Sequence, residues 1–407
     1  MSPQVRKIIL SHGLTGFICW YGVEKVFQKT IGISVLQVSL LAISYIAISA
    51  LLNVPTGILA DRKGRRFAIV LATICLLFST IVGGLSHNLW VYFASFILWG
   101  LFYTTQNGSY QAILYDTLKE EGREKDYARY TGASVAAFWT AVFLSSVIGA
   151  WIGSHFNLRL AYFVTIIPNV INIFLALTLH EPERKKHDHT VTSFSMARQG
   201  FKFLKSSRQV LLLTGAFLLS SMLSWTTNEF SQLFFIELGF GVLFVGVIGA
   251  FSGLLQAGGS FIAHRFTHVS IRLMTVLSML ALFITFIIPI HLRYLAVAGF
   301  FSLVILRQVL YISNDAALQH SLPSSIRATT LSSVGVLNDG VLIVCYFLFG
   351  FVSEHKNVRT GYLVVGLCGL LIIGITWLLS EKLKYRSVPE YPLEPLEATA
   401  ETDSFPR

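Results

Sequence analysis

Long apolar runs recur along the whole chain, and they restrict its fold more than any other feature. Each run is about 20 residues or longer, enough to cross the hydrocarbon core of a bilayer as a helix. Only 13% of the 407 residues are charged, about half of the roughly 25% found in soluble domains. The sequence therefore predicts an all-α, multi-pass membrane protein with twelve spans. The expected spans run near 6–28, 34–60, 67–86, 90–117, 128–154, 158–179, 210–236, 242–264, 271–290, 293–320, 328–353 and 358–380.

Polar segments divide these spans into two sets of six. We expect a first six-helix half at 1–181, a basic linker at 182–209, a second half at 210–382 and a polar tail at 383–407. Composition predicts a flexible tail, because the segment is poor in apolar residues and rich in Glu and Pro. The domain organisation is thus six spans, a linker and six spans.

Basic residues gather in alternate connections. The loops near 61–66 and 119–129 and the linker are rich in Lys and Arg, whereas the intervening connections hold few. This bias predicts that both termini lie in the cytoplasm. The net charge of +10 is therefore read as membrane topology, with a lipid bilayer and not a nucleic acid as the partner. Short loops without large extramembrane domains favour a prokaryotic cytoplasmic membrane.

The four cysteines lie inside apolar runs without metal-ligand spacing, so we expect inert packing residues and no disulfide framework. No nucleotide-binding loop is present, since Gly64 is followed by two arginines. The sequence predicts no metal site, no cofactor and no enzymatic activity.

The segment Gly57-Ile-Leu-Ala-Asp-Arg-Lys-Gly-Arg-Arg66 lies between the second and third spans. It resembles the signature G-x-L-A-D-R-x-G-R-R of the major facilitator superfamily, in the loop where that family carries it. The resemblance covers nearly the whole chain, and it implies two pseudo-symmetric six-helix halves that transport a small molecule by alternating access.

The resemblance also implies a charged gate at the cytoplasmic face, in which acids and arginines hold one state shut. Further acid and arginine pairs flank the loops between spans four and five and between spans ten and eleven. The candidate gate residues are Gly57, Asp61, Arg62, Gly64, Arg65, Arg66, Asp116, Arg129, Asp315 and Arg327. The alternative for the signature segment is an anchor that only sets topology.

A tryptophan followed four residues later by a glutamate occurs in both halves. Trp20 and Glu24 lie in the first span, and Trp225 and Glu229 lie at the corresponding place in the seventh. Residues four apart share a helix face, and Gln232 extends that polar face in the seventh span. A rise of about 1.5 Å per residue places both acids towards the outer end. We expect gate or proton-coupling acids; the alternative for Glu24 is an interfacial anchor.

Other polar residues inside spans are candidates for the substrate or proton pathway. Gln106 and Tyr110 either line a cavity or form hydrogen bonds between helices. Arg307 and Asp339 lie near the middle of consecutive spans, where an unpaired charge costs at least about 2.5–3.5 kcal/mol. We therefore expect them to form an ion pair that lines or braces a central cavity.

The sequence favours a monomeric secondary transporter for a small molecule. Resemblance to the family's exporters suggests efflux coupled to protons. The fifth span, however, carries Gly149 and Gly153 without the proline of the drug–proton antiporters. Two alternatives stay open: an uptake carrier or uniporter for a polar metabolite, and a membrane sensor or scaffold that does not transport.

Overall fold

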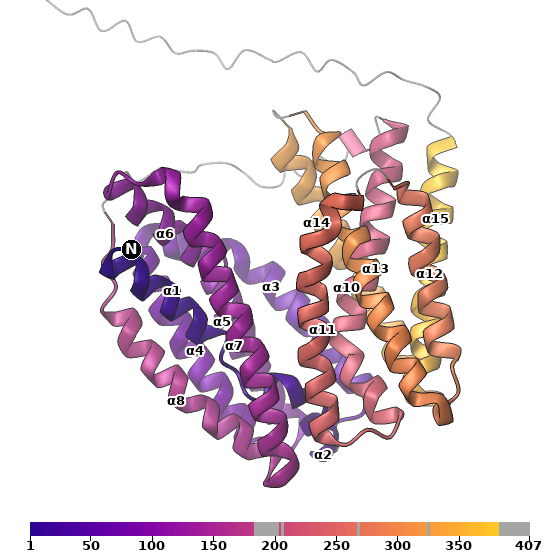
Figure 1. Cartoon of the computed structure of the whole chain (residues 1–407), viewed down its shortest axis with the longest axis horizontal. Helices are drawn as coiled ribbons and strands as arrows, with labels where there is room; N and C mark the ends of the chain where they lie inside the picture. Colours follow the sequence, from indigo (N-terminus) through magenta and orange to yellow (C-terminus); the bar gives the residue numbers. More distant parts are fainter. Residues whose placement is uncertain (183–202, 205–206, 267–268, 324–325, 382–407) are drawn as a thin grey trace, which may run out of the picture.

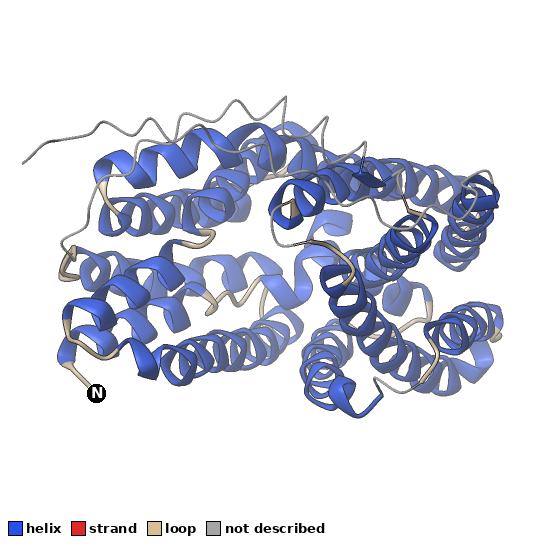
Figure 2. Cartoon of the chain, turned by 90° about the horizontal axis from the view of Figure 1, so that it is seen from above, coloured by secondary structure: helices blue, strands red, loops and turns tan. Residues whose placement is uncertain are grey.

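The computed structural model describes residues 1–182, 203–204, 207–266, 269–323 and 326–381. Most of the expected linker and the whole tail lie outside these residues. The described chain consists of helices and the loops that connect them (Figure 2). Nine of its helices are long and apolar enough to cross a membrane, and α12 is apolar but shorter.

The first half packs as one group of helices (Figure 1). Its elements are α1 (Pro3–Thr15), η1 (Tyr21–Val23), α2 (Glu24–Thr30), α3 (Val35–Lys63), α4 (Arg65–Leu85), α5 (Leu89–Gln106), α6 (Ser109–Glu120), η2 (Glu124–Asp126), α7 (Tyr127–His155) and α8 (Leu158–Leu177). Two expected spans are broken: the first is divided among α1, η1 and α2, and the fourth is divided between α5 and α6. If the pieces of each broken span are counted together, the first half has six spans.

The second half forms the other group. Its elements are α10 (Arg208–Glu237), α11 (Val242–Ile262), η3 (Ala263–Phe266), α12 (Ile271–Ile287), η4 (Ile290–Leu292), α13 (Arg293–His320), α14 (Arg327–His355) and α15 (Val358–Glu381). These helices supply the remaining six spans, so the predicted fold class is confirmed.

Local sequence explains where the helices begin and end. The Ser34 hydroxyl accepts a hydrogen bond from the Gln37 amide, and the Gln37 side chain accepts one from the Ser34 amide. This reciprocal cap begins α3. The loop between α3 and α4 is Gly64 alone, with φ at +111°, a backbone conformation that favours glycine. Two consecutive long helices can therefore reverse direction within one residue.

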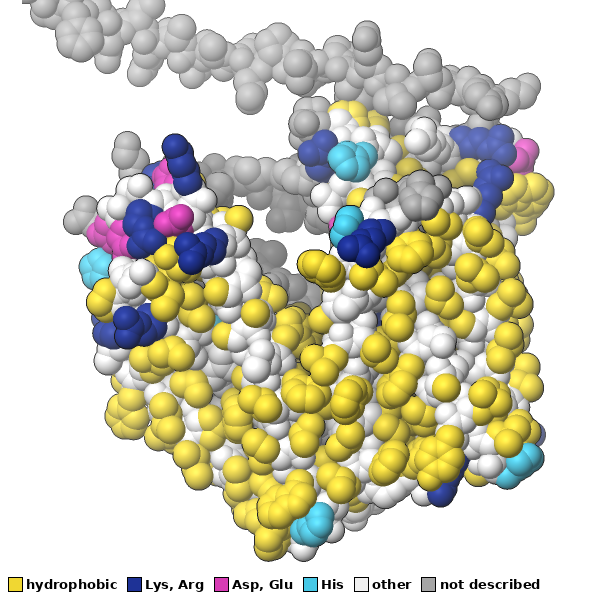
Figure 3. All heavy atoms as spheres, in the orientation of Figure 1, with side chains coloured by type: hydrophobic (Ala, Val, Ile, Leu, Met, Phe, Trp, Pro, Cys, Tyr) yellow, Lys and Arg dark blue, Asp and Glu magenta, His cyan; other side chains and the backbone are white. Residues whose placement is uncertain are grey.

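The two halves meet at one end of the molecule and diverge towards the other (Figures 1 and 3). They pack together through α3 on α14 and through α7 on α11, while η1 and α2 lie against α11 and α10. We call this the closed end; it includes residues 21–34. The other end is the basic end, formed by residues 61–66, 119–129, 263–266, 269–272, 320–323 and 326–327. Figure 3 shows charged side chains at the basic end, with a hollow between the halves there and apolar side chains along the flanks.

Glycine allows the closest contacts at the closed end. A Cβ atom on Gly149 of α7 would lie 1.7 Å from the carbonyl oxygen of Cys19, and one on Gly350 of α14 would lie 2.4 Å from Ser39 Oγ of α3. No larger side chain fits there without a shift of the backbone or its neighbours. Gly149 and Gly350 therefore allow close packing of neighbouring segments at this end.

Candidate functional site

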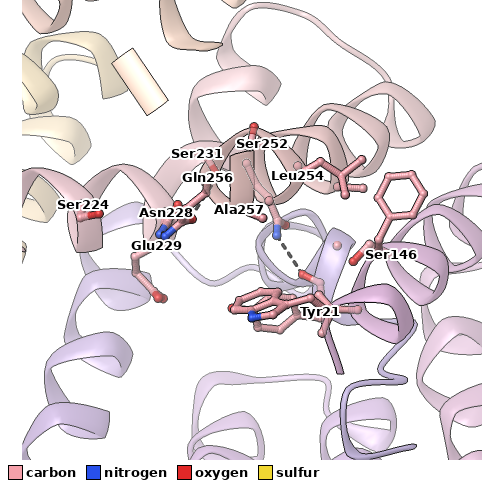
Figure 4. Close-up of a pocket in the computed structure, with 18 of the residues that line it drawn as sticks. Tyr21, Ser146, Ser224, Asn228, Glu229, Ser231, Ser252, Leu254, Gln256 and Ala257 are labelled. Carbon is pink, nitrogen blue, oxygen red and sulfur yellow. Dashed lines mark hydrogen bonds between the residues drawn. The ribbon is translucent and has the colours of Figure 1, made fainter. Parts of the chain in front are cut away.

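A cavity lies between the two halves, next to the closed end. It has about 330 Å³ of space for water-sized molecules. Its walls come from η1, α2 and α7 of the first half and from α10, α11 and α13 of the second. Figure 4 shows Asn228 and Glu229 of α10 on one side, Gln256 of α11 nearby and Tyr21 of the first half opposite. The cavity is mixed in chemistry: exposed aromatic rings, including Trp139 and Trp225, alternate with amides, hydroxyls and charges.

Three charged side chains close the cavity towards the closed end; we call Glu24, Lys25 and Glu229 the ion cluster. Lys25 Nζ lies 3.1 Å from Glu24 Oε2 and 2.6 Å from Glu229 Oε1. Glu24 Oε1 also accepts hydrogen bonds from Gln28 and from the Tyr92 hydroxyl. Glu24 and Lys25 are buried, whereas the Glu229 side chain is 30% exposed. One lysine thus joins an acid of the first half to an acid of the second.

Two further contacts join the halves at the closed end. Gln232 of α10 accepts a hydrogen bond from the Lys25 amide and donates one to the Tyr21 carbonyl, both at 2.9 Å. Glu354 of α14 accepts from the amides of Val35 and Leu36 at 2.8 and 3.2 Å. A carboxylate at the N-terminus of α3 is stabilised by unpaired N–H groups and by the helix dipole. The Lys25–Glu229 ion pair, the hydrogen bonds of Gln232 and those of Glu354 would all break if the halves separated at this end.

The two tryptophan–glutamate pairs are not equivalent, contrary to the sequence-based expectation. Trp225 and Glu229 lie on continuous α10 and both line the cavity. Trp20 precedes η1, where the helix is interrupted, so the four-residue spacing does not place it beside Glu24. It is buried in the first half, where it stacks on Tyr162 with ring centres 5.0 Å apart. Trp20 is a core residue, and Trp225 is a cavity residue.

The helix break in the fourth span also separates Gln106 from Tyr110. Gly108, with φ at +73°, lies between α5 and α6, so the two residues do not share one helix face. The Tyr110 hydroxyl is buried and lies 2.9 Å from Ser11 Oγ. Tyr110 therefore forms a hydrogen bond between helices α1 and α6 and does not line the cavity. Gln106 is half-buried at the end of α5 and does not line the cavity.

Arg307 and Asp339 do not form the expected ion pair. Arg307 is fully buried and donates to the Ser224 carbonyl and hydroxyl and to Asn228 Oδ1. Among the described ion pairs, none includes Asp339, which is half-buried on α14. The physical reason is packing: α13 packs on α10, α11 and α12, whereas α14 packs on α3, α10 and α15. The two helices are consecutive in sequence without being packing partners.

The signature segment holds the first half together at the basic end. Asp61 and Arg65 form an ion pair at 2.8 Å one turn apart. Glu181, just after α8, accepts from the amides of Arg65 and Arg66 at 2.7 and 2.6 Å and so caps α4. A Cβ atom on Gly64 would lie 2.9 Å from this carboxylate. The segment therefore ties α4 to the end of α8.

Its other residues are more exposed. Arg66 also donates to the Leu177 carbonyl at 2.6 Å. Gly57 lies on an open face of α3, and Arg62 is exposed at the end of that helix. Gly57 and Arg65 line a second pocket, of about 200 Å³, beside the break between α5 and α6.

The other candidate gate residues are not paired with one another in the described structure. Between α6 and α7 the ion pairs belong to Arg123, which lies 2.8 Å from Asp126 and also bonds the Tyr130 hydroxyl. The hydrogen bond to Asp126, followed by that to Tyr130, raises the pKa of Arg123. Asp116 is half-buried and Arg129 exposed, with its guanidinium over the Tyr130 ring.

The corresponding pair of the second half is also apart. Asp315 accepts from Gln319 at 2.7 Å, and Arg327 donates to the Leu322 carbonyl at 3.1 Å.

Sequence reasoning missed three residues that make the most informative contacts. Lys25 directly follows Glu24 in an apolar segment, and this pair of opposite charges is the signal that could have identified it. Glu181 and Glu354 lie at the ends of spans, where a carboxylate can cap a neighbouring helix, but the sequence does not name the helix. Within the described residues, no group of three or more His, Cys, Asp or Glu side chains is arranged to hold a metal ion.

These features define an integral, multi-pass membrane protein with two six-helix halves around a central cavity. The family model of the Major Facilitator Superfamily matches residues 8–344. The chain belongs to this superfamily, whose members are transporters and not enzymes. No curated protein matches the chain.

Two solved structures share the fold over nearly their whole length. A mutant of the nucleoside transporter NupG has a TM-score of 0.76 at 13% identity, with 92% of this chain and 99% of that chain covered. A bacterial homologue of the human lysosomal transporter Spinster, in an inward-facing and unoccupied conformation, has a TM-score of 0.72 at 16% identity, with 94% and 98% covered. At these identities the likeness shows the fold alone.

Proposed function

We propose that the protein is a monomeric secondary transporter that exports a small organic compound by alternating access, driven by protons. The observation that carries the proposal is the ion cluster, in which Lys25 holds Glu24 of one half and Glu229 of the other at the closed end. The cavity lies directly beside it. Rocking of the halves must break the Lys25–Glu229 bond before the cavity can open at this end.

Protons enter this scheme through the charge of the cluster. Two carboxylates share one lysine, so the fully ionised cluster carries an excess negative charge in a poorly hydrated place. Binding of one proton to Glu24 or Glu229 removes that excess. Binding of a proton to Glu229 in particular removes the charge that attracts Lys25 across the boundary between the halves. Each opening of the closed end would therefore be linked to proton uptake or release.

The orientation of the chain follows from its basic residues. The positive-inside rule places the basic end, and with it both termini, in the cytoplasm. The state described here would then be inward-facing, with the closed end towards the outside. The signature segment and the pairs Asp116 with Arg129 and Asp315 with Arg327 would act when the basic end closes. We place the protein in a prokaryotic cytoplasmic membrane.

An uptake carrier for a polar metabolite is the second candidate. The amide side chains of Asn228, Gln232 and Gln256 on the cavity wall favour it, because such groups bind neutral polar solutes through hydrogen bonds. The nucleoside transporter NupG shares the fold. A sensor or scaffold that does not transport has less support. Among the described residues, the hydrogen bonds and ion pairs between the halves lie at the closed end, and such an arrangement suits a protein that alternates between two states.

Proteoliposomes with an imposed pH gradient test both candidates. The probes are ethidium, indole-3-propionate and uridine, which represent cationic, anionic and neutral solutes. We expect accumulation of one probe that depends on the gradient, and loss of that dependence in Glu229→Gln and Glu24→Gln. Flux that ignores the gradient would favour facilitated uptake. Full coupling in both variants would contradict the role given to the ion cluster.

A further inference from the structure

Arg307 is a buried cation that has no carboxylate partner among the described residues. Its side chain is fully buried in the middle of α13. Its partners are the carbonyl and hydroxyl of Ser224 and the amide oxygen of Asn228, the last at 2.6 Å. Its Nε has no hydrogen-bond partner in the described part of the chain. Removing a guanidinium from water costs several kcal/mol, which neutral acceptors offset only in part. The site therefore lacks a countercharge.

The partners of Arg307 are themselves walls of the cavity. Ser224 and Asn228 line it, and so does Gln308, the next residue along α13. Asn228 is exposed to the cavity, and Figure 4 shows it beside Gln256 of α11. Arg307 is thus separated from the cavity by one layer of side chains.

The hydrogen bonds of that layer orient its donors. Asn228 accepts from Arg307 through Oδ1, and its Nδ2 donates to Gln256 Oε1 at 3.3 Å. Each amide oxygen therefore already accepts one hydrogen bond. The second N–H of Asn228 and both N–H groups of Gln256 remain to face a solute. Donors in front of an uncompensated positive charge suit an anionic group.

Glu229 is the competing feature, since a partly exposed carboxylate in the same cavity favours a cation. Its Oε1, however, is 2.6 Å from Lys25 Nζ, so its charge already has a partner. Under the proposed function, the ion cluster binds a proton and becomes neutral. The positive charge of Arg307 is then the excess charge beside the cavity.

We propose that Arg307 recognises the substrate and that the substrate is an organic anion, with a carboxylate or a similar group and an apolar body. The anion displaces the Asn228 oxygen from the guanidinium and accepts two parallel N–H bonds, the geometry that arginine offers to carboxylates. The exposed rings of Trp139 and Trp225 contact the apolar body. This inference rests on the proposed function, because it assigns a substrate class to the same cavity.

Thermal stabilisation of the purified full-length protein tests the proposal with three compounds that share one ring system. Indole-3-propionate is an anion, tryptamine a cation and indole-3-ethanol neutral. We expect indole-3-propionate to raise the melting temperature of the wild type and the other two not to. Arg307→Gln should weaken this binding at least about tenfold, the effect of losing a hydrogen-bonded charge. Arg293→Gln is the matched control, since this arginine lies at the N-terminus of α13 over Phe240 and Tyr294, and the variant should bind as the wild type does.

Asn228→Asp gives a second, independent readout. The new carboxylate would supply the missing countercharge from within the chain, so the variant should melt at or above the wild-type temperature and lose binding of indole-3-propionate. If the cavity instead selects cations through Glu229, the same change should strengthen binding of tryptamine. That result would overturn the proposal.

Three other results would also overturn it: no stabilisation of the wild type by indole-3-propionate, stabilisation by tryptamine of equal size, or unchanged binding in Arg307→Gln. None of these outcomes depends on transport. Proton-driven transport of ethidium or uridine in proteoliposomes, with no transport of the anion, would refute the substrate class and leave the transport function standing. Binding of indole-3-propionate without transport of any probe would refute the transport function and leave the substrate class standing.

Discussion

The Glu354 carboxylate caps a helix of the opposite half, so its neutralisation should shift the balance between the two states. In Glu354→Gln the side chain keeps an acceptor for the amides of Val35 and Leu36 and loses only its charge. A charge at an exposed helix N-terminus contributes about 0.3–1 kcal/mol, and more when it is partly buried. Glu354 is exposed, so we take about 1 kcal/mol, which changes the ratio of the two states by about fivefold. The contact exists only while the closed end is closed, so the change should favour the state that is open there.

Glu237 provides the matched control. It accepts from the Val358 amide and pairs with Arg359 at 2.9 Å, so it caps α15 in the way that Glu354 caps α3. Both of its partners lie in the second half, as Glu237 itself does. Glu237→Gln should therefore lower the melting temperature and leave the ratio of states unchanged.

Electron–electron double resonance can measure that ratio. Spin labels at Lys125 and His320, exposed positions of the two halves at the basic end, would report their separation in a background without the four native cysteines. Glu354→Gln should increase the ratio of the short-separation population to the long-separation population about fivefold, because closing the basic end accompanies opening of the other. An unchanged distance distribution, or an equal shift in Glu237→Gln, would refute the reasoning.

Two further predictions concern the packing of the first half and the walls of the cavity. Gly149→Ala should destabilise the protein by about 1–3 kcal/mol, because its Cβ would overlap a backbone carbonyl; Gly132→Ala on the same helix, with nothing within 4 Å, should be neutral or slightly stabilising, and equal melting temperatures for the two variants would contradict this. Trp20→Ala should cost about 3–5 kcal/mol of stability, whereas Trp225→Ala, at a side chain 46% exposed in the cavity, should weaken solute binding with little loss of stability. A similar loss of stability in both tryptophan variants would contradict the distinction between core and cavity.

The twelve spans could be predicted because each one is a local property of the chain. A run of apolar residues long enough to cross a bilayer forms a helix wherever it packs. The turn at Gly64 could be anticipated in the same way, because its residue type permits the backbone that the loop needs. These features depend on residues close together in the sequence, and the structure confirms the fold they imply.

The partners of charged residues depended on information that the sequence does not hold. The pairing of Arg307 with Asp339 assumed that consecutive helices are neighbours. In the structure α13 and α14 both pack on α10, but they are not packing partners of each other. The equivalence of Trp20 with Trp225 assumed an unbroken first helix. Glu354 lies 319 residues from Val35, the residue whose amide it accepts from. Only the packing of the whole chain brings such groups together.

The interruption of the first span has a consequence for how the protein enters the membrane. α1 has 13 residues, about 20 Å of helix, which is too short to cross the hydrocarbon core alone. In the segment that follows it, the Cys19 amide donates to Thr165 Oγ1 of α8, and the Gly16 carbonyl accepts from Ser145 of α7. Unpaired backbone groups are costly in lipid, and these partners are synthesised more than a hundred residues later. We therefore expect the span that contains α1 to reach its final depth only after α7 and α8 have arrived, so that this half is completed in an order that does not follow synthesis.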